Sequence, residues 1–301
     1  MPGNLHLEQI QKSLLLACDY YNDILQLMEL SSITDSNGYI KIAAFDHRDS
    51  LKKIISEKRI SEFKSLCARL FSNYSTAILV DPEYGLESIK IAQSQNKGIL
   101  LGREQSGYTD SEQGRETVLD KNFTSKTLKE MGATAIKLFI YFNQDAKNAN
   151  KQIDIVKKVS EEAKAVDLPF LVEPITYPVD GHYYHRGDSI IKTIIAIRDH
   201  CDILKIEYPV DPDIEGVRSA IPYLNQISEE LSIPWVLLSK GMKFENYKKA
   251  LILAKNAGCS GFAVGRAVWQ EVSNFQNWEE KVNFMENTAV NRMKDLFEIW
   301  S

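Results

Sequence analysis

The sequence predicts a single-domain α/β protein, a (β/α)8 TIM barrel that spans residues 1–301. Eight short apolar runs recur along the chain, and the segments between them repeat apolar residues at the three-to-four spacing of amphipathic helices. Most of the runs are apolar at consecutive positions, as in parallel strands buried on both faces. The alternative is a doubly wound sheet, but no glycine-rich dinucleotide fingerprint follows the first run. The eight evenly distributed units therefore favour the barrel.

The expected elements follow in chain order. The strands are Ile40–Asp46, Ala77–Asp81, Gly98–Arg103, Ala135–Tyr141, Phe170–Pro174, Ile203–Tyr208, Trp235–Ser239 and Gly261–Val264. The clearest helices between them are Arg59–Phe71, Asn150–Ala165, Ile214–Leu231 and Phe244–Ala257, and an extra helix at Leu5–Leu30 precedes the barrel. The third connection, from Glu104 to about Asn122, is polar and contains glycine, so we expect a long loop over the barrel mouth.

Composition narrows the function. The chain is 44% hydrophobic and carries a net charge of −5, which argues against a general affinity for nucleic acid or anionic membranes. An anionic ligand would need a local cluster of cations and amides. The four cysteines are far apart in sequence and are expected to be buried thiols of a reducing cytosol. The sequence shows neither a signal peptide nor an apolar run of membrane-spanning length, so we expect a cytoplasmic protein.

Charged residues are concentrated at the expected strand ends, which is where TIM barrels carry their active sites. They are Asp46, His47, Arg48, Asp81, Glu83, Arg103, Glu104, Lys137, Glu173, Lys205, Glu207, Lys240 and Arg266. Such a ring of charge inside an otherwise apolar barrel indicates a catalytic or binding site.

Lys205 is the most specific candidate for a catalytic residue, because it is flanked by apolar residues on a strand expected to be central. Burial and a neighbouring cation such as Lys137 would favour a neutral amine, which can form an imine with a ketone. Lys137 is also a candidate for binding phosphate. The structural alternative is two ion pairs, Lys137 with Glu173 and Lys205 with Glu207. We favour the functional interpretation, since buried charges are seldom retained for stability alone.

Two carboxylates complete the candidate catalytic set. Glu173 is on the strand next to both lysines and could accept the proton of a substrate hydroxyl, or simply balance the charge of Lys137. Asp46, at the end of the first strand, could do similar work or orient hydroxyl groups of a substrate.

The last two strand ends resemble a phosphate-binding site. Ser239, Lys240 and Gly241 follow the seventh strand, and Gly265 and Arg266 follow the eighth. TIM barrels frequently bind phosphate at these loops, and an arginine suits bidentate contact with phosphate oxygens. Either glycine alone would be explained as a tight-turn residue.

The histidines do not predict a metal site. His182 and His185 have a spacing that would suit metal ligands, but no third ligand lies near them in sequence. A solvated or substrate-contacting loop is the better interpretation. We expect no metal and no cofactor.

Five stretches together resemble a known family. They are Ala44–Arg48, Leu79–Gly85, Ala135–Tyr141, Leu204–Val210 and Gly261–Trp269. In barrel order they are similar to class I tagatose 1,6-bisphosphate aldolases and the related sulfofructosephosphate aldolases, and the likeness extends from about Ile40 to Trp269. It implies that Lys205 is the Schiff-base lysine, that Glu173 is the acid/base, and that Asp46 and Lys137 are further active-site residues. It also implies anion binding by Arg48, Arg266 and the Ser239–Gly241 turn.

The resemblance implies a substrate class, although this sequence differs from the family at several positions. His47 stands where the family usually has glutamine, Asp49 stands where it has glycine, and the region after Glu173 is short. We expect cleavage of a phosphorylated ketohexose, such as tagatose 1,6-bisphosphate, into dihydroxyacetone phosphate and an aldehyde. Sulfofructosephosphate cleavage and a non-catalytic phosphosugar sensor are the alternatives, and a homo-oligomer stays open.

Overall fold

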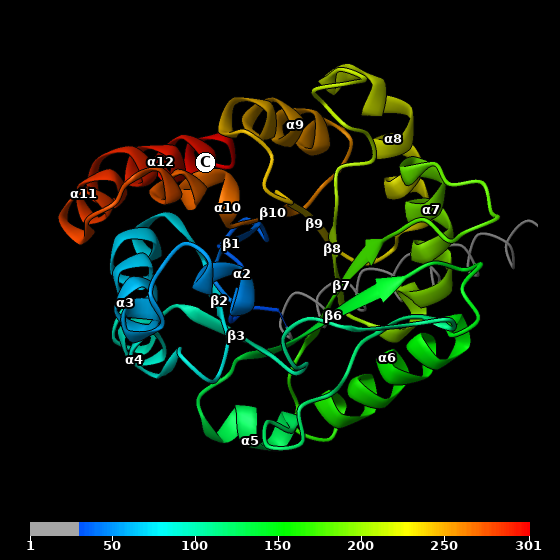
Figure 1. The fold of residues 1–301 in the computed structure, drawn as a ribbon, viewed down its shortest axis with the longest axis horizontal. Coiled ribbons are helices and arrows are strands. Elements are labelled where there is room, and N and C mark those ends of the chain that lie inside the picture. Colours follow the sequence, from blue (N-terminus) through cyan, green and yellow to red (C-terminus); the bar gives the residue numbers. More distant parts are fainter. Residues whose placement is uncertain (1–29) are drawn as a thin grey trace, which may run out of the picture.

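The computed structural model describes residues 30–301, and within them eight parallel strands close into a barrel. The strands are β1 (Ile40–Ala44), β2 (Ala77–Val80), β3 (Gly98–Gly102), β6 (Ala135–Phe142), β7 (Phe170–Thr176), β8 (Ile203–Ile206), β9 (Trp235–Leu238) and β10 (Gly261–Val264). Around the barrel they are ordered β1-β10-β9-β8-β7-β6-β3-β2, so each strand lies beside its neighbours in sequence (Figure 1). This confirms the predicted (β/α)8 barrel. The extra helix expected at Leu5–Leu30 lies outside the described residues, apart from Leu30 itself.

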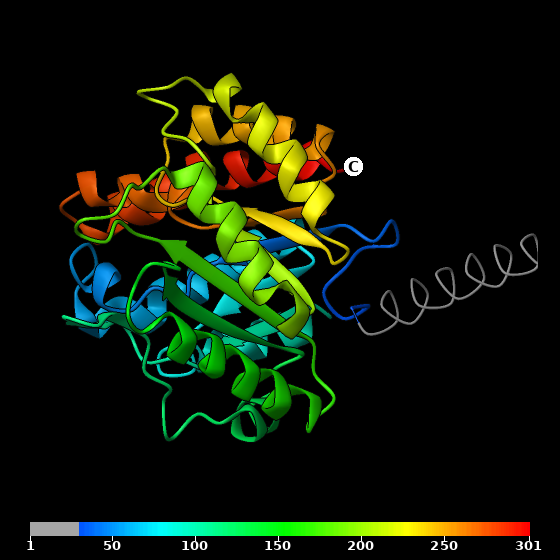
Figure 2. The same ribbon diagram turned by 90° about the vertical axis from the view of Figure 1, so that its right-hand side faces the viewer.

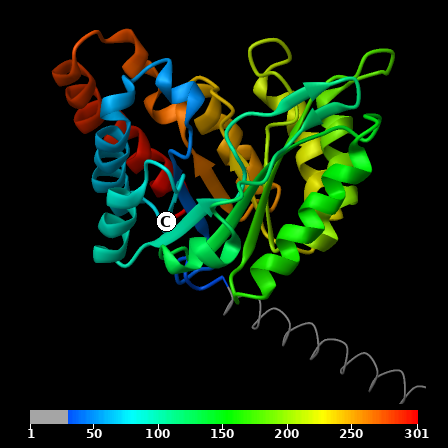
Figure 3. The same ribbon diagram turned by 60° about the horizontal axis from the view of Figure 1, so that its bottom comes forward.

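Helices surround the barrel, and in two further views the strands all run toward the same end (Figures 2 and 3). The α-helices are α2 (Asp49–Lys52), α3 (Ile60–Phe71), α4 (Leu86–Ser94), α5 (Ser125–Glu130), α6 (Ala149–Lys164), α7 (Arg186–Ile197), α8 (Ile221–Glu230), α9 (Phe244–Asn256), α10 (Arg266–Trp269), α11 (Trp278–Phe284) and α12 (Val290–Ile299). Short 3-10 turns are η1 (Glu57–Arg59), η2 (Ser72–Tyr74), η3 (Arg198–His200), η4 (Val217–Ala220) and η5 (Gln270–Asn274), and η6 (Met285–Ala289) is a π-helical turn. None of the helices in residues 30–301 is both long and apolar enough to cross a membrane.

Two expectations need correction in detail. The helix expected from Ile214 starts at Ile221 instead, because Gly216 has a φ of 77° and Pro222 stands in the first turn, where proline favours a helix start. The connection after Glu104 is not entirely loop, since it contains a short antiparallel hairpin of β4 (Thr109–Ser111) and β5 (Gly114–Glu116).

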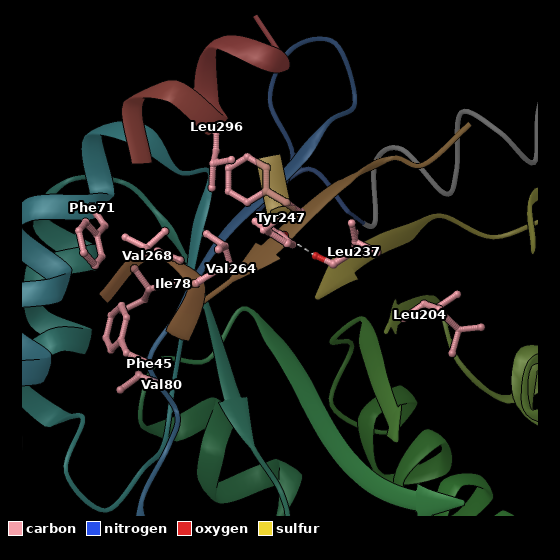
Figure 4. Close-up of a cluster of buried hydrophobic side chains, with 14 of the residues drawn as sticks. Phe45, Phe71, Ile78, Val80, Leu204, Leu237, Tyr247, Val264, Val268 and Leu296 are labelled. Atoms are coloured by element: carbon pink, nitrogen blue, oxygen red, sulfur yellow. Dashed lines mark hydrogen bonds between the residues drawn. The ribbon is translucent and has the colours of Figure 1, made fainter. Parts of the chain in front are cut away.

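The apolar core has two layers. Residues such as Ile42, Leu79 and Leu100 form a cluster that is distinct from the larger one. The larger cluster lies between the strands and the helices, and part of it is shown in Figure 4, where the Tyr247 hydroxyl donates to the Leu237 carbonyl oxygen at 2.8 Å. Cys67, Cys201 and Cys259 are buried free thiols, as expected for these three cysteines.

Candidate active site

A cavity of about 600 Å³ opens at the carboxyl end of the barrel. This size suits a small metabolite. Its polar lining includes Asp46, His47, Arg48, Glu104, Arg115, Lys137, Tyr141, Glu173, Tyr184, Arg186, Lys205, Ser239, Lys240 and Arg266, and Gly265 also lines it. All of the expected catalytic and anion-binding residues except Gly241 therefore line one cavity, whereas the charged strand-end residues Asp81, Glu83, Arg103 and Glu207 are not part of its lining.

Strand alternation explains why the charged side chains share this space. Lys137 is two residues after Ala135 on β6, and Lys205 is two residues after Ile203 on β8. Both apolar residues belong to the smaller apolar cluster, and a strand returns to the same face every second residue. Glu173 follows Leu171 in the same way on β7. The apolar layer thus lies beneath a charged layer.

Lys137 is held by three carboxylates. Its Nζ lies 2.9 Å from Asp46 Oδ2, 2.9 Å from Glu104 Oε1 and 3.1 Å from Glu173 Oε2. The other oxygen of Glu104 accepts the backbone N–H of Phe139 at 3.0 Å. Burial by itself would lower the pKa of Lys137, but the three carboxylates raise it well above its usual value. Lys137 therefore remains an ammonium ion.

Lys205 has a simpler environment. Its Nζ lies 2.9 Å from Glu173 Oε2, the same oxygen that contacts Lys137, and this is its single ion pair among the described residues. Burial would raise the pKa of Glu173, but the ammonium groups of Lys205 and Lys137 together bring it below the usual value. Glu173 is thus an ionised carboxylate between two lysines.

The alternative ion pair between Lys205 and Glu207 is not formed. Strand β8 ends at Ile206, and Glu207 instead contacts Lys240. Glu207 Oε1 also accepts the backbone N–H and the hydroxyl of Thr176, at 2.8 and 2.7 Å. Both lysines line the cavity, and each has its own carboxylate partner, Glu207 for Lys240 and Glu173 for Lys205.

Asp46 and His47 connect this cluster to the first strand. Burial would raise the pKa of Asp46, but Lys137 and Lys205 hold it well below its usual range. Burial lowers the pKa of His47 to about 4, although Asp46 opposes this shift. The imidazole is therefore neutral near pH 7, with its Nδ1 3.8 Å from Asp46 Oδ1.

The two glycine-containing turns meet, as expected for an anion site. Lys240 and Gly241 have φ angles of 46° and 75°, and a Cβ on Gly241 would lie 3.7 Å from the Arg266 Cζ. A Cβ on Gly265 would lie 2.6 Å from the Ala44 carbonyl oxygen, so a side chain does not fit there. Ser239 Oγ accepts the Ala267 N–H at 3.5 Å.

The two expected anion-binding arginines differ in how they are engaged. Within residues 30–301, the Arg266 guanidinium has no hydrogen-bond or ion-pair partner, and it faces the cavity. Arg48 Nη2 donates to the Glu104 carbonyl oxygen at 2.6 Å, and Arg48 is only 8% exposed. Arg266 is therefore the more available cation of the two.

Several residues that line the cavity have no role that the sequence predicts. The sequence indicates Glu104 only as a charged strand end, although it is one of the three partners of Lys137. Arg115 and Tyr141 were not singled out, since one lies in the connection expected to be loop and the other is the last residue of an apolar run. Neither residue carries a motif that could have revealed its position.

In the described part of the chain, no group of three or more His, Cys, Asp or Glu side chains is arranged to hold a metal ion, and the three carboxylates that meet at Lys137 bind its ammonium group. His185 instead stacks on Tyr223, with ring centroids 5.3 Å apart and its Nδ1 3.2 Å from the Tyr223 hydroxyl.

Comparison with known families agrees with this geometry. The sequence model of the DeoC/LacD family aldolases matches residues 40–271, which is nearly the whole barrel. The chain belongs to this aldolase family. It is therefore a lyase, and every candidate site residue lies within the matched range.

Curated relatives within the family are similar over most of their length. The tagatose 1,6-diphosphate aldolase 1 of Enterococcus faecalis is 30% identical over 90% of this chain and 93% of its own. The tagatose 1,6-diphosphate aldolase of Streptococcus agalactiae is 29% identical over 80% of this chain and 83% of its own. That of Listeria monocytogenes is 30% identical over 80% of each chain.

Solved aldolase structures share the fold. A fructose-bisphosphate aldolase from Plasmodium falciparum superposes with a TM-score of 0.71 at 13% identity, covering 91% of this chain and 93% of that one. An archaeal fructose-1,6-bisphosphate aldolase, solved with its catalytic lysine bound to a carbinolamine intermediate, gives a TM-score of 0.63 at 16% identity. It covers 90% of this chain and 99% of the archaeal one.

Proposed function

We propose that this aldolase cleaves a phosphorylated ketohexose such as tagatose 1,6-bisphosphate into dihydroxyacetone phosphate and glyceraldehyde 3-phosphate, through an imine on Lys205. One observation carries the assignment of the nucleophile. Lys205 faces the cavity with a single carboxylate partner, whereas Lys137 is held by three. The names of the curated relatives support the choice of sugar.

Imine formation uses the contact between Lys205 and Glu173. The Lys205 ammonium passes a proton to Glu173 Oε2, which lies 2.9 Å away, and the free amine attacks the C2 carbonyl carbon. A proton then moves from the attached nitrogen to the former carbonyl oxygen, which gives a carbinolamine. Glu173 then returns its proton to this hydroxyl group, water leaves, and a protonated imine remains.

Bond cleavage uses the same carboxylate as a base. Glu173 is ionised again once water has left, and it accepts the proton of the C4 hydroxyl. The electrons of the C3–C4 bond move into the protonated imine, so glyceraldehyde 3-phosphate leaves and an enamine stays on Lys205. Protonation of C3 and hydrolysis of the imine then release dihydroxyacetone phosphate and restore the amine.

The remaining residues support these steps. The Lys137 ammonium stabilises the ionised forms of Glu173 and Asp46, which it contacts at 3.1 and 2.9 Å. Asp46 orients substrate hydroxyl groups from the end of β1. Arg266, with Ser239 and the Lys240–Gly241 turn, holds the phosphate nearest the imine, because an unpaired guanidinium suits phosphate oxygens. Arg48 is a further anion-binding residue.

The test is trapping with borohydride. The protein is incubated with tagatose 1,6-bisphosphate, fructose 1,6-bisphosphate and dihydroxyacetone phosphate, each with and without EDTA, and the reduced adducts are mapped by mass spectrometry. We expect an adduct on Lys205 with dihydroxyacetone phosphate and turnover of at least one ketose bisphosphate, both unaffected by EDTA. No adduct with any of these compounds would favour a non-catalytic sensor, and a loss of turnover that zinc restores would exclude this mechanism.

A further inference from the structure

A second unpaired guanidinium faces the cavity from the β4–β5 hairpin. The Cζ atom of Arg115 lies 4.8 Å from the ring centroids of Tyr108 and Tyr177 and 5.3 Å from that of Tyr141. Arg115, Tyr141 and Tyr177 all line the cavity. Among the residues that the structure describes, no carboxylate and no hydrogen-bond acceptor engages this guanidinium. The cation is surrounded by aromatic rings and turned toward the substrate space.

The backbone of Arg115 is fixed by contacts with distant segments. Its N–H donates to the Tyr177 hydroxyl at 3.1 Å, and its carbonyl oxygen accepts from Asn148 Nδ2 at 2.9 Å. The adjacent Gly114 has a φ of 121°, and a Cβ there would lie 2.6 Å from both the Tyr177 Oη and the Asn148 Oδ1. The hairpin is therefore seated closely on the barrel, and the position of Arg115 is set before any ligand binds.

The tyrosines stabilise the cation without neutralising it. A cation–π contact stabilises the cation only weakly, and the ring face carries no net charge. The planar guanidinium keeps its N–H donors, which match two oxygens of a tetrahedral anion. Arg115 is thus prepared for an anionic ligand rather than for a structural ion pair.

The strand order places Arg115 across the mouth from Arg266. Three strands separate β10 from β6 in either direction around the ring, so these two strands are opposite each other. Arg266 follows β10, and the hairpin of Arg115 contacts β6. Lys205 on β8 and Glu173 on β7 lie along the path between them. A ketose with its first phosphate at Arg266 and its C2 at Lys205 would extend past Glu173 toward Arg115.

Arg48 is less well placed for the far end of the sugar. It follows β1, which is the neighbour of β10, and its guanidinium already donates to a backbone carbonyl oxygen. If Arg48 bound the far anionic group, both anion sites would lie on the same side of the barrel, away from the bond that is cleaved. The family resemblance implies that Arg48 binds an anion, and the structure offers Arg115 as a second candidate whose guanidinium is unpaired among the described residues.

We infer that Arg115, with Tyr141 and Tyr177, forms the subsite for the anionic group at the far end of the substrate, on the part that leaves as the aldehyde. The ligand chemistry is a tetrahedral oxyanion, either a phosphate ester or a sulfonate. This inference rests on the proposed function, because it takes the imine to be on Lys205.

The test uses the reaction in the direction of synthesis, which does not depend on the stereochemistry of the sugar. Dihydroxyacetone phosphate is condensed with glyceraldehyde 3-phosphate, with its sulfonate analogue and with uncharged glyceraldehyde. The measured quantity is the ratio of kcat/KM for each anionic aldehyde to that for glyceraldehyde. In Arg115→Met we expect the ratio to fall about ten- to a hundredfold, as for the loss of a charged hydrogen-bonded contact.

Two further variants separate binding from structure. Arg115→Lys keeps the charge but not the planar guanidinium, so its ratio of kcat/KM values should fall less than that of Arg115→Met. This variant tests the subsite even if the methionine variant does not fold. Lys151→Met is the matched control, because Lys151 pairs with Glu116 on the same hairpin strand, is 61% exposed and is not part of the cavity lining. We expect no change of the ratio in this control.

The outcomes distinguish the two proposals. If the wild-type protein gives no borohydride adduct with dihydroxyacetone phosphate, the proposed function fails and this inference fails with it. If the adduct forms and Arg115→Met keeps the wild-type ratio, only the inference is overturned, and a fall of the ratio in Arg48→Met would move the subsite to Arg48. The anionic aldehyde with the higher wild-type ratio identifies the oxyanion as phosphate or sulfonate.

Discussion

Lys137 on β6 and Lys205 on β8 invite comparison, because they are chemically identical, similarly buried and joined through one oxygen atom. They are 2% and 4% exposed, and both contact Glu173 Oε2. They differ in their other partners, since Lys137 also contacts Asp46 and Glu104. The number of carboxylates, rather than depth in the barrel, separates the two residues.

Under the proposed mechanism, this difference gives each lysine its own role. A charge held by three carboxylates is costly to remove, and its loss would leave several buried anions uncompensated. Lys137 therefore serves as a fixed positive charge. In the proposed mechanism, Lys205 gives its proton to the one carboxylate that it contacts, as imine formation requires. We propose that the second buried lysine belongs to the arrangement that lets the first one react.

The largest effect should come from replacing each of the two lysines in turn. We expect Lys205→Met to abolish both the borohydride adduct and sugar cleavage, because Lys137 is held by three carboxylates and Lys240 is paired with Glu207. The measurement is mass spectrometry after reduction with dihydroxyacetone phosphate. In Lys137→Met the adduct should still form on Lys205, only more slowly. An adduct that maps to Lys137 in the wild-type protein would reverse the comparison.

The next effect concerns the carboxylate that the lysines share. Glu173→Gln keeps the size of the side chain but cannot accept a proton, so we expect cleavage to slow by about 10²–10⁴-fold. Binding of dihydroxyacetone phosphate, measured by calorimetry, should be largely retained, whereas trapping by borohydride should slow because Glu173 also transfers the protons of imine formation. Turnover at the wild-type rate would show that another group accepts the C4 hydroxyl proton. Asp46→Asn is the matched comparison, because Asp46 contacts Lys137 but has no ion pair with Lys205 among the described residues.

Stability should also distinguish the lysines. Lys137→Met removes the common partner of Asp46, Glu104 and Glu173, and we expect a loss of about 3–5 kcal/mol in the free energy of unfolding. Lys205→Met leaves Glu173 paired with Lys137 and should cost clearly less. Urea unfolding of both variants at pH 7 measures the difference. Equal losses would mean that the number of carboxylate partners does not govern this site.

The sequence could predict which side chains enter the barrel, but not how they pair. Apolar runs located the strands, and the period of two then placed Lys137, Glu173 and Lys205 on the inner face. The pairing of Lys205 with Glu207 was a reasonable alternative, but it depended on the strand continuing past Ile206. Where a strand ends is decided by tertiary contacts that no local pattern contains.

Loop residues were harder to predict for the same reason. Arg115 reaches the cavity because Gly114 and its neighbours pack on Asn148 and Tyr177, 33 and 62 residues away from Arg115 in the chain. The sequence of this polar, glycine-containing segment does not indicate that it packs against Asn148 and Tyr177. The turns at Gly241 and Gly265 were predictable, because TIM barrels reuse the last two loops for phosphate.

A smaller effect should separate substrate binding from the chemistry at the lysines. Arg266→Ala removes a charged contact worth roughly 1.5–3 kcal/mol, so we expect a loss of about ten- to a hundredfold in capture of dihydroxyacetone phosphate. The rate of borohydride trapping as a function of ligand concentration measures this loss. At saturating ligand, the adduct should still form on Lys205. Normal capture by the variant would move the first phosphate away from the β9 and β10 turns.

The smallest effect tests whether His47 competes with Lys137 for Asp46. Burial lowers the pKa of His47 from 6.5 to about 4, so between these values the unfolded chain binds a proton that the folded protein does not. The contribution of His47 to stability is therefore complete above pH 6.5 and is lost as the pH falls toward 4. Between pH 7 and pH 5 this loss amounts to about 2 kcal/mol of unfolding free energy. His47→Gln cannot titrate and should lack it, whereas His182→Gln, on an exposed loop, should behave like the wild-type protein. The measurement is urea unfolding at pH 7, 6 and 5.

If His47→Gln loses stability with the same dependence on pH as the wild-type protein, then His47 is already protonated in the folded state. Asp46 would then have a second cationic partner, and Lys137 would no longer be the dominant positive charge at this carboxylate.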